Sequence, residues 1–154
     1  MKKYAKIITA ILLVSLLALT LFACFDSGND KDGTMTLVLV NGDVVKEYVV
    51  DLSKLPSGDN QSTGLIAILD YLQNDGKLTY ALNGTMITKV NDLEYSVENS
   101  TFIAIYTNVT KDMSVAEWAE DYTHKGIKCT STDQSASGMS ILANCVVVLK
   151  LATW

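Results

Sequence analysis

Arginine is absent from this 154-residue sequence, and histidine and proline occur once each, as His124 and Pro56. Without a guanidinium group the chain lacks the planar donor that holds phosphates and carboxylates by two parallel hydrogen bonds. A single histidine excludes a metal site built from histidines alone and gives little support to a histidine-dependent catalytic triad. The three cysteines lack Cys-x-x-Cys spacing, so we expect no redox-active pair. Two thiols and one distant histidine are a poor set of zinc ligands, and we expect no cofactor.

Apolar residues make up 49% of the chain. This share suffices for a packed core and is far higher than in disordered chains. The length fits one domain of ordinary size and leaves no room for a large multidomain enzyme.

The first residues have the pattern of a secretory signal. Three lysines among the first six residues precede an apolar run of 17 residues, 7–23. A basic start followed by an apolar stretch and small residues is typical of exported proteins. Because 17 residues lie at the lower end of the roughly 17 to 25 that cross a bilayer as a helix, an uncleaved membrane anchor is the alternative.

The end of the apolar run carries a more specific pattern. Leu21-Phe22-Ala23-Cys24 resembles the lipobox of bacterial lipoproteins, with leucine three residues before a cysteine and a small residue directly before it. The resemblance implies that residues 1–23 are a lipoprotein signal peptide and that Cys24 is acylated. Because two or more acyl chains hold a protein stably on a membrane, we expect an extracytoplasmic protein anchored to the bacterial cell membrane. A plain signal with a chance cysteine is the alternative.

Cleavage before Cys24 would leave nine lysines against 17 acidic residues, a net charge of −8. Such a surface repels nucleic acid and anionic lipid headgroups, so neither is an expected partner. Residues 24–33 comprise Cys24, the expected lipidation site, and the segment 25–33, which is polar and contains glycine, as is typical of a flexible tether. The nine residues of this segment span at most ~30 Å. Residues 34–154 are therefore expected to form a single domain close to the membrane.

Several segments of the mature chain have strand or helix patterns. Asn41-Gly42 separates the β-rich runs 35–40 and 44–50, which predicts a hairpin that pairs Leu39 with Val44. A helix is expected to begin at Ser62 or Thr63 and to end near Asn74, with one apolar stripe made by Leu65, Ile68, Leu69 and Leu72. The remaining predicted elements are a hairpin at Asn83-Gly84 that places Tyr80 opposite Ile87, strands at 102–106, 122–130 and 145–151, and a short helix at 111–121. This order predicts an α+β fold in which antiparallel hairpins pack on one main helix.

Short segments spread over residues 34–151 are similar to one known family. They are Thr36–Val40, Gly64–Leu69, Ser100–Ile105, Trp118, Gly138-Met139-Ser140 and Asn144–Val148. Through them the chain resembles the small domain found at the C-terminus of transcobalamin and intrinsic factor and in many bacterial surface lipoproteins. The resemblance implies a β-grasp-like fold, in agreement with the element order. In the vitamin carriers this domain covers one side of a corrinoid, which makes a corrinoid a candidate ligand, although a fold does not by itself establish function.

Cys129 and Cys145 remain after Cys24 is assigned to lipid. Two cysteines in an exported protein, each at an end of a predicted strand, predict a disulfide. A closed loop of about 15 residues would add ~3 kcal/mol in the chain-entropy model. Two reduced, buried thiols are the alternative.

Aromatic side chains with polar tips suit ligand-binding surfaces. Trp118, Tyr122 and the nearby His124 are therefore the candidate ligand-binding residues, with core and cross-strand packing as the alternative for most aromatics.

Acidic and serine-rich segments are the remaining candidates for chemistry. Glu117, Glu120 and Asp121 share one face of the predicted short helix, where a solvated helix face is the simpler interpretation than an acid–base site. No Gly-x-Ser-x-Gly motif accompanies the serines at 131–140, so a hydrolase is the least supported hypothesis.

The sequence therefore predicts a non-catalytic, membrane-anchored lipoprotein whose domain binds a small molecule, such as a corrinoid, or a peptide. The alternative is a structural or protein-interaction module of a cell-envelope assembly. An exposed sheet edge or a contiguous apolar patch would favour that alternative.

Overall fold

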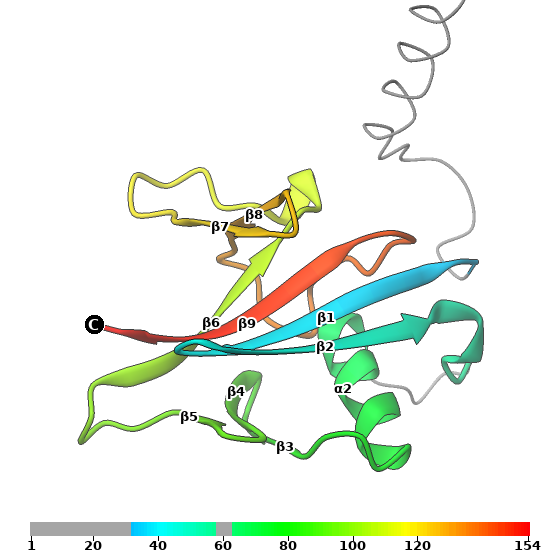
Figure 1. Ribbon diagram of the computed structural model, residues 1–154, viewed down its shortest axis with the longest axis horizontal. Helices are drawn as coiled ribbons and strands as arrows, with labels where there is room; N and C mark the ends of the chain where they lie inside the picture. The colour runs from blue at the N-terminus through cyan, green and yellow to red at the C-terminus, as the bar shows by residue number, and fades with distance from the viewer. Residues whose placement is uncertain (1–31, 58–62) are drawn as a thin grey trace, which may run out of the picture.

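The computed structural model describes residues 32–57 and 63–154 (Figure 1). The predicted signal peptide, Cys24 and most of the predicted tether lie outside the described residues. Within the described ranges, no helix has the length and apolar character needed to span a bilayer. These residues form nine strands and one α-helix, which agrees with the expected α+β class.

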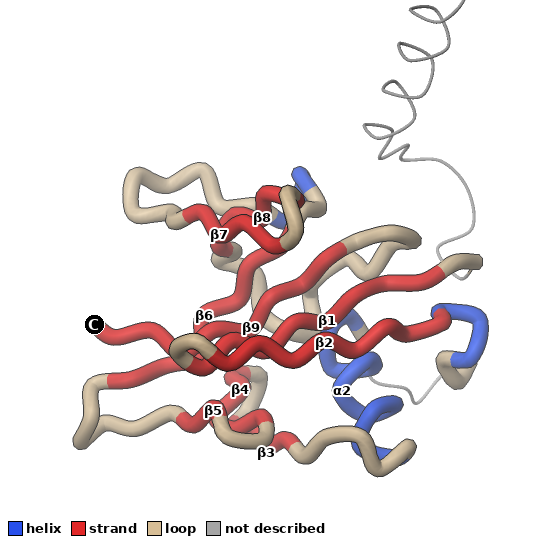
Figure 2. Tube along the Cα trace, in the orientation of Figure 1, coloured by secondary structure: helices blue, strands red, loops and turns tan. Residues whose placement is uncertain are grey.

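Strands are the main regular structure of the described chain (Figure 2). In chain order the elements are β1 (Thr34–Asn41), β2 (Val44–Asp51), the 3-10 helix η2 (Leu52–Lys54), α2 (Gly64–Asn74), β3 (Tyr80–Asn83), β4 (Met86–Val90), β5 (Leu93–Glu94), β6 (Thr101–Thr107), the 3-10 helix η3 (Thr110–Asp112), β7 (Asp121–His124), β8 (Ile127–Ser131) and β9 (Val146–Thr153). Six strands form one sheet in the order β2-β1-β9-β6-β8-β7, and β3, β4 and β5 form a second sheet. Strands β1 and β9 are parallel, whereas β6 runs antiparallel to β9.

The main core lies between the six-stranded sheet and α2. The predicted helix stripe is confirmed, since four of its side chains are fully buried, namely Leu65, Ile68, Leu69 and Leu72. They belong to one cluster with inward side chains of the two parallel strands, Leu37, Leu39, Val147 and Leu149. The inward side chains of the strands, which alternate along the chain, thus pack against the apolar stripe of α2. Burial of this apolar surface is the main contribution to stability here.

A second, smaller cluster covers the other face of the same sheet. It consists of Val38, Val40, Tyr106, Cys129, Val146 and Val148. The β7–β8 hairpin lies on this side of the long strands, away from α2 (Figure 1). The sheet curls so far that Lys125 Nζ, in the β7–β8 turn, comes within 2.8 Å of Glu47 Oε2 in β2, although these strands occupy opposite ends of the strand order.

Both predicted hairpins form, but their turns lie one residue later than expected. The loops are Gly42-Asp43 and Gly84-Thr85, so Leu39 pairs with Lys46, and Ile87 pairs with Leu82. Gly42 and Gly84 have φ angles of 58° and 61°, which suits a two-residue turn with glycine at the first central position. In each hairpin the pairing partner differs from the predicted one by two residues. Because side chains alternate between the two faces of a strand, this even shift leaves the predicted inward face unchanged.

The short helix predicted at 111–121 is wrong. After η3 the chain follows an irregular path, on which Val115 is fully exposed and Trp118 is 61% exposed. Backbone groups of this segment form hydrogen bonds with β8 in place of helical hydrogen bonds. The Glu120 N–H donates to Ser131 Oγ at 2.9 Å, and the Ser131 N–H donates to the Glu120 carbonyl at 2.8 Å.

The single strand predicted at 122–130 is also wrong, because the chain reverses within it to form the β7–β8 hairpin. Lys125 and Gly126 have φ angles of 48° and 83°. Positive φ at both central residues is the geometry of the tight turn that matches the twist of antiparallel strands.

Candidate functional site

A groove with a volume of about 480 Å³ runs along the edge of β6. Its walls come from the β3–β4 turn, from the loop that carries Trp118 and from the segment after β8. The lining residues used below are Met86, Ile87, Phe102, Ile103, Ala104, Tyr106, Trp118, Glu120, Asp133 and Ala136. The volume falls within the roughly 300 to 1,000 Å³ of known small-molecule sites.

The edge of β6 inside the groove is incompletely covered. Strand β9 pairs with β6 from Thr101 to Thr107, whereas β8 pairs with β6 only at Tyr106 and Thr107. Beyond that point, the Thr132 N–H donates to the Ile105 carbonyl at 2.9 Å. At the other end of β6, residues 96 and 101 form an isolated antiparallel bridge.

Ile103 lies between these two covered positions. Because hydrogen-bonding direction alternates along an antiparallel strand, Ile103 directs its N–H and C=O to the same edge as Ile105 and Thr101. Within residues 32–57 and 63–154, no strand pairing or loop hydrogen bond occupies Ile103 on that edge. Ile103 is 8% exposed and lines the groove, so within the described residues the groove contains one unpaired backbone donor and one unpaired backbone acceptor.

The aromatic side chains of Phe102 and Trp118 line the groove. Phe102 is 36% exposed, and its ring centroid lies 6.0 Å from that of Trp154. Trp154 in turn lies 5.9 Å from the ring of Tyr95, which gives an exposed aromatic patch beside the Thr101 end of β6. Trp118 lines the groove from the loop that precedes β7.

The charged lining is acidic. Among the described residues that line the groove are the carboxylates of Glu120 and Asp133, and none of these residues is lysine or histidine. The Tyr106 hydroxyl donates to Glu120 Oε2 at 3.2 Å. Burial, together with the adjacent Glu120 charge, raises the pKa of Tyr106 to about 12, so this phenol remains a hydrogen-bond donor at neutral pH.

The wall formed by the segment after β8 is held against the start of α2. The Leu65 N–H donates to the Ala136 carbonyl at 2.8 Å, and Thr63 Oγ1 donates to the Ser137 carbonyl at 2.9 Å. A Cβ on Gly64 would come within 2.6 Å of the Ala136 carbonyl oxygen. Glycine at this position therefore allows the close approach that positions one side of the groove.

The structure separates the three predicted ligand-binding residues. Trp118 lines the groove, whereas Tyr122 packs against Tyr106 with centroids 6.1 Å apart and lies under Lys150 Nζ at 5.7 Å. His124 lies at the far end of β7, where its buried Nε2 is 3.4 Å from Glu47 Oε1 without hydrogen-bond geometry. Sequence reasoning missed Phe102 and Ile103 as lining residues.

Among the described residues, the side-chain oxygens of Glu120 and Asp121 accept hydrogen bonds from Tyr106 and Thr130, and not from His124 or a serine. Asp121 accepts a hydrogen bond from Thr130 Oγ1 at 2.8 Å and lies 2.8 Å from Lys128 Nζ. These contacts lower the pKa of Asp121 below its ordinary value. The buried Asp112 accepts from the Ser140 N–H at 2.6 Å, which fixes the loop before β9 and gives Asp112 a structural role.

Cys129 and Cys145 are both buried, and no disulfide joins them in this structure. Their side chains belong to different clusters: Cys129 to the one under the β7–β8 hairpin, Cys145 to the one under α2. Burial, followed by the effect of Cys145, raises the pKa of Cys129 to about 11. The predicted disulfide stays a prediction.

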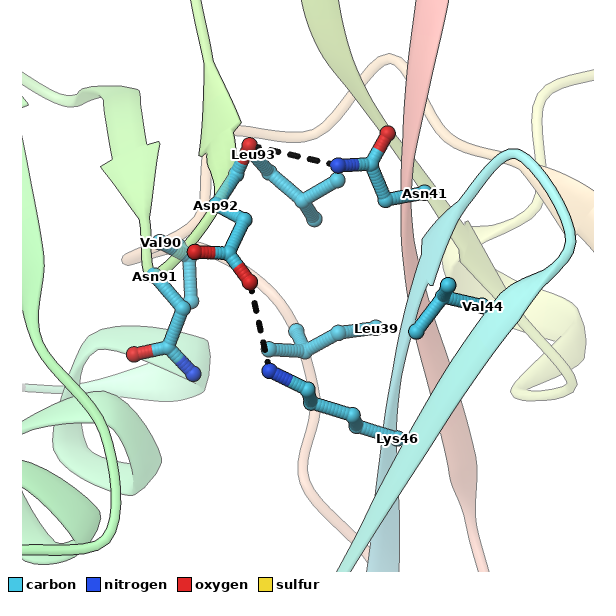
Figure 3. Close-up of a pocket in the computed structure, with 8 residues that line it drawn as sticks. All are labelled: Leu39, Asn41, Val44, Lys46, Val90, Asn91, Asp92 and Leu93. Carbon is cyan, nitrogen blue, oxygen red and sulfur yellow. Dashed lines mark hydrogen bonds and ion pairs between the residues drawn. The ribbon is translucent and has the colours of Figure 1, made fainter.

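A smaller pocket, of about 70 Å³, lies between the β1–β2 hairpin and the β4–β5 turn (Figure 3). Leu39, Val90 and Leu93 line it with apolar surface. Lys46 Nζ reaches Asp92 Oδ2 at 3.2 Å, and Asn41 Nδ2 donates to the Asp92 carbonyl at 3.4 Å. Because its volume is well below that of known ligand pockets, we interpret it as a junction between the two sheets.

No family model and no curated protein matches the chain. It resembles the crystal structure of a "putative metal binding protein" from Ruminococcus gnavus ATCC 29149, with 12% sequence identity, a TM-score of 0.48, and coverage of 80% of this chain and 99% of that chain. A similarity of this extent carries no argument about function. Among the residues described, no group of three or more His, Cys, Asp or Glu side chains is placed to hold a metal ion.

Proposed function

We propose that this protein is a membrane-anchored extracytoplasmic lipoprotein whose single domain, residues 34–154, binds a small molecule or a peptide without catalysing a reaction. The observation that carries the proposal is the groove along β6. It combines ligand-sized volume, exposed aromatic surface at Trp118 and Phe102, and open backbone hydrogen-bonding groups at Ile103. Apolar surface with a few convergent polar groups is the usual composition of a binding site.

The anchor part of the proposal rests on the lipobox resemblance at Leu21–Cys24. The test is to express the full-length chain in bacteria with radiolabelled palmitate and to compare it with Cys24→Ser. We expect label and a membrane location for the unchanged chain and the loss of both in the variant. Unlabelled, detergent-independent protein from the unchanged gene would contradict the anchor.

We further propose that the fold is a β-grasp-like variant and that the domain is related to the transcobalamin C-terminal family. Support comes from the β1–β2 hairpin followed, after η2, by α2, from the central parallel pairing of β1 with β9, and from the packing of α2 on one face of that sheet. Under this proposal a corrinoid is the candidate small molecule.

Ligand binding is tested by melting curves of the full-length chain in detergent with excess cobalamin. A ligand that binds only the folded state raises the melting temperature by mass action. A rise that is lost in Trp118→Ala would support a corrinoid in the groove. No rise and no change in the cobalamin spectrum would remove the corrinoid as the ligand.

A protein-interaction module of a cell-envelope assembly is the second candidate function. Strand β2 ends the six-stranded sheet, and none of the strands described pairs with its outer edge. Val45 and Val49 on this strand are 45% and 64% exposed. Because exposed apolar edge strands pair with other chains, Val49→Lys is expected to abolish co-purification of an envelope partner if this function holds. Unchanged co-purification would contradict it.

A further inference from the structure

We propose that the groove binds a short peptide in extended conformation, which pairs with the backbone of Ile103 and places a basic side chain beside Glu120. This inference rests on the ligand-binding function proposed above and names the class of ligand. It is carried by three features of the groove: the gap in edge pairing, the chemistry of its two faces and its charge.

The gap in pairing has the dimensions of a short strand. Thr101 and Ile105, the covered positions on either side of Ile103, are four residues apart, which corresponds to about 13 Å of strand. Both are already bonded on this edge by backbone groups, from Ser96 and Thr132 respectively. A three-residue extended segment would continue the same ladder between them through the Ile103 N–H and C=O. Peptide addition to a sheet edge is a common mode of recognition.

The two faces of the groove favour different side chains. The peptide residue opposite Ile103 would point to the same face as Ile103, because paired residues in antiparallel strands share a face. That face carries Ile87 and Ala136, which belong to the main core cluster with Ile103. An apolar residue such as leucine is therefore expected at the central position.

The neighbouring peptide residues would point to the opposite face, which carries Ala104 and Tyr106. Tyr106 holds the carboxylate of Glu120 there, and Trp118 lies two residues before Glu120. A lysine or arginine side chain can contact both the carboxylate and the indole face. Asp133 is the second lining carboxylate, and none of the described lining residues is basic. The groove therefore favours a basic–apolar–basic segment.

The first test measures whether backbone pairing is required. The probe is the acetylated and amidated peptide Ser-Lys-Leu-Lys-Ser, added to the full-length chain in detergent. A Trp154→Phe background leaves Trp118 as the sole tryptophan, since the chain has two. We expect a saturable change in Trp118 fluorescence. N-methylation of the central leucine removes its backbone donor, and we expect about tenfold weaker binding. Equal binding of both peptides would overturn the backbone pairing.

The second test measures the charge preference with matched variants. Glu120→Gln keeps an acceptor for the Tyr106 hydroxyl, whereas Glu117→Gln removes an exposed carboxylate that does not line the groove. We expect Glu120→Gln to weaken Lys-containing peptide binding about fivefold and Glu117→Gln to leave it unchanged. Melting temperatures close to that of the unchanged chain would show that both variants are folded. Equal affinity of both variants would overturn the assignment of Glu120.

One comparison separates failure of this inference from failure of the proposed function. If cobalamin changes Trp118 fluorescence and the Lys peptide does not, the groove binds a ligand but not a peptide, and only the inference fails. If a Ser-Asp-Leu-Asp-Ser peptide binds as tightly as the Lys peptide, the charge argument fails. If neither cobalamin nor any peptide changes the fluorescence or the melting temperature, both the inference and the proposed function fail.

Discussion

The buried hydroxyl of Tyr106 donates to the carboxylate of Glu120 at 3.2 Å and so links the central strand β6 to the loop that carries Trp118. Tyr106 is 2% exposed. Because its ring cannot move without disturbing the cluster under the β7–β8 hairpin, the bond orients a groove carboxylate from a rigid element. The acidic side of the groove is thus positioned by the core.

Alkaline titration tests the environment of Tyr106. Burial raises the pKa of both Tyr80 and Tyr106 from 10.0 to about 12. Since these pKa values are raised in the folded state, the stability that the two phenols contribute is fully present below pH 10 and is lost as pH rises through about 12. We expect the ultraviolet absorbance of phenolate to show two late-titrating tyrosines, and one fewer in Tyr106→Phe. Titration of every tyrosine near pH 10 would contradict the burial.

Gly64→Ala tests the contact between α2 and the groove wall. The added Cβ would lie 2.6 Å from the Ala136 carbonyl oxygen and 2.9 Å from that of Met139, at a φ of +59°. Gly42→Ala is the matched control, because its φ is +58° and no atom lies within 4 Å of the added Cβ. Positive φ alone costs about 1 to 2 kcal/mol. In urea unfolding we therefore expect Gly64→Ala to lose at least ~2 kcal/mol more than the control, since backbone carbonyls must shift. Equal losses would show that this close approach is not required.

Acid titration tests the contact that closes the curled sheet. A hydrogen bond from Lys125 lowers the pKa of Glu47 below 4.5, with further contributions from the Lys125 charge and from His124. Because the pKa is lowered on folding, the stability that Glu47 contributes is present above pH 4.5 and is lost as pH falls through the lower, folded-state pKa. Melting temperatures of the unchanged chain and of Glu47→Gln should therefore differ at neutral pH and converge in acid. A difference that persists at the lowest pH would contradict the assignment.

The state of the two cysteines is tested by intact mass without reductant. The disulfide predicted between Cys129 and Cys145 requires a mass two hydrogens below that of the dithiol form, and a full complement of thiols would contradict it. For the thiol form, burial and a pKa of about 11 predict that Cys129 is alkylated only after unfolding. Rapid alkylation of the folded chain would show that Cys129 is accessible.

Local patterns predicted the helix and most strands, because burial of one face requires a fixed apolar spacing. The stripe from Leu65 to Leu72 is buried as expected. The turn positions differ from the prediction because the Asn-Gly pattern predicts asparagine at the first central position, whereas Gly42 occupies that position. The turn of the β7–β8 hairpin contains Gly126, a glycine that favours a turn, although the β-rich residues on both sides predict one continuous strand.

Less of the candidate site than of the fold can be predicted from the sequence. Trp118 was identified by its chemistry, although its exposure results from a loop and not from the predicted helix. The open edge at Ile103 depends on where β8 leaves β6, after Thr130 and Ser131, which are more than twenty residues away in the chain. Such a long-range relationship has no local pattern in the sequence.

Amide hydrogen exchange at Ile103 tests the central claim most directly. The full-length chain is measured in detergent by NMR with and without saturating Ser-Lys-Leu-Lys-Ser. The amides of Phe102 and Ala104 serve as internal controls, because strand alternation directs them to β9. We predict that the peptide slows exchange at Ile103 and leaves the two controls unchanged. An unchanged Ile103 amide at saturation, or protection confined to the outer edge of β2, would contradict a binding site in this groove.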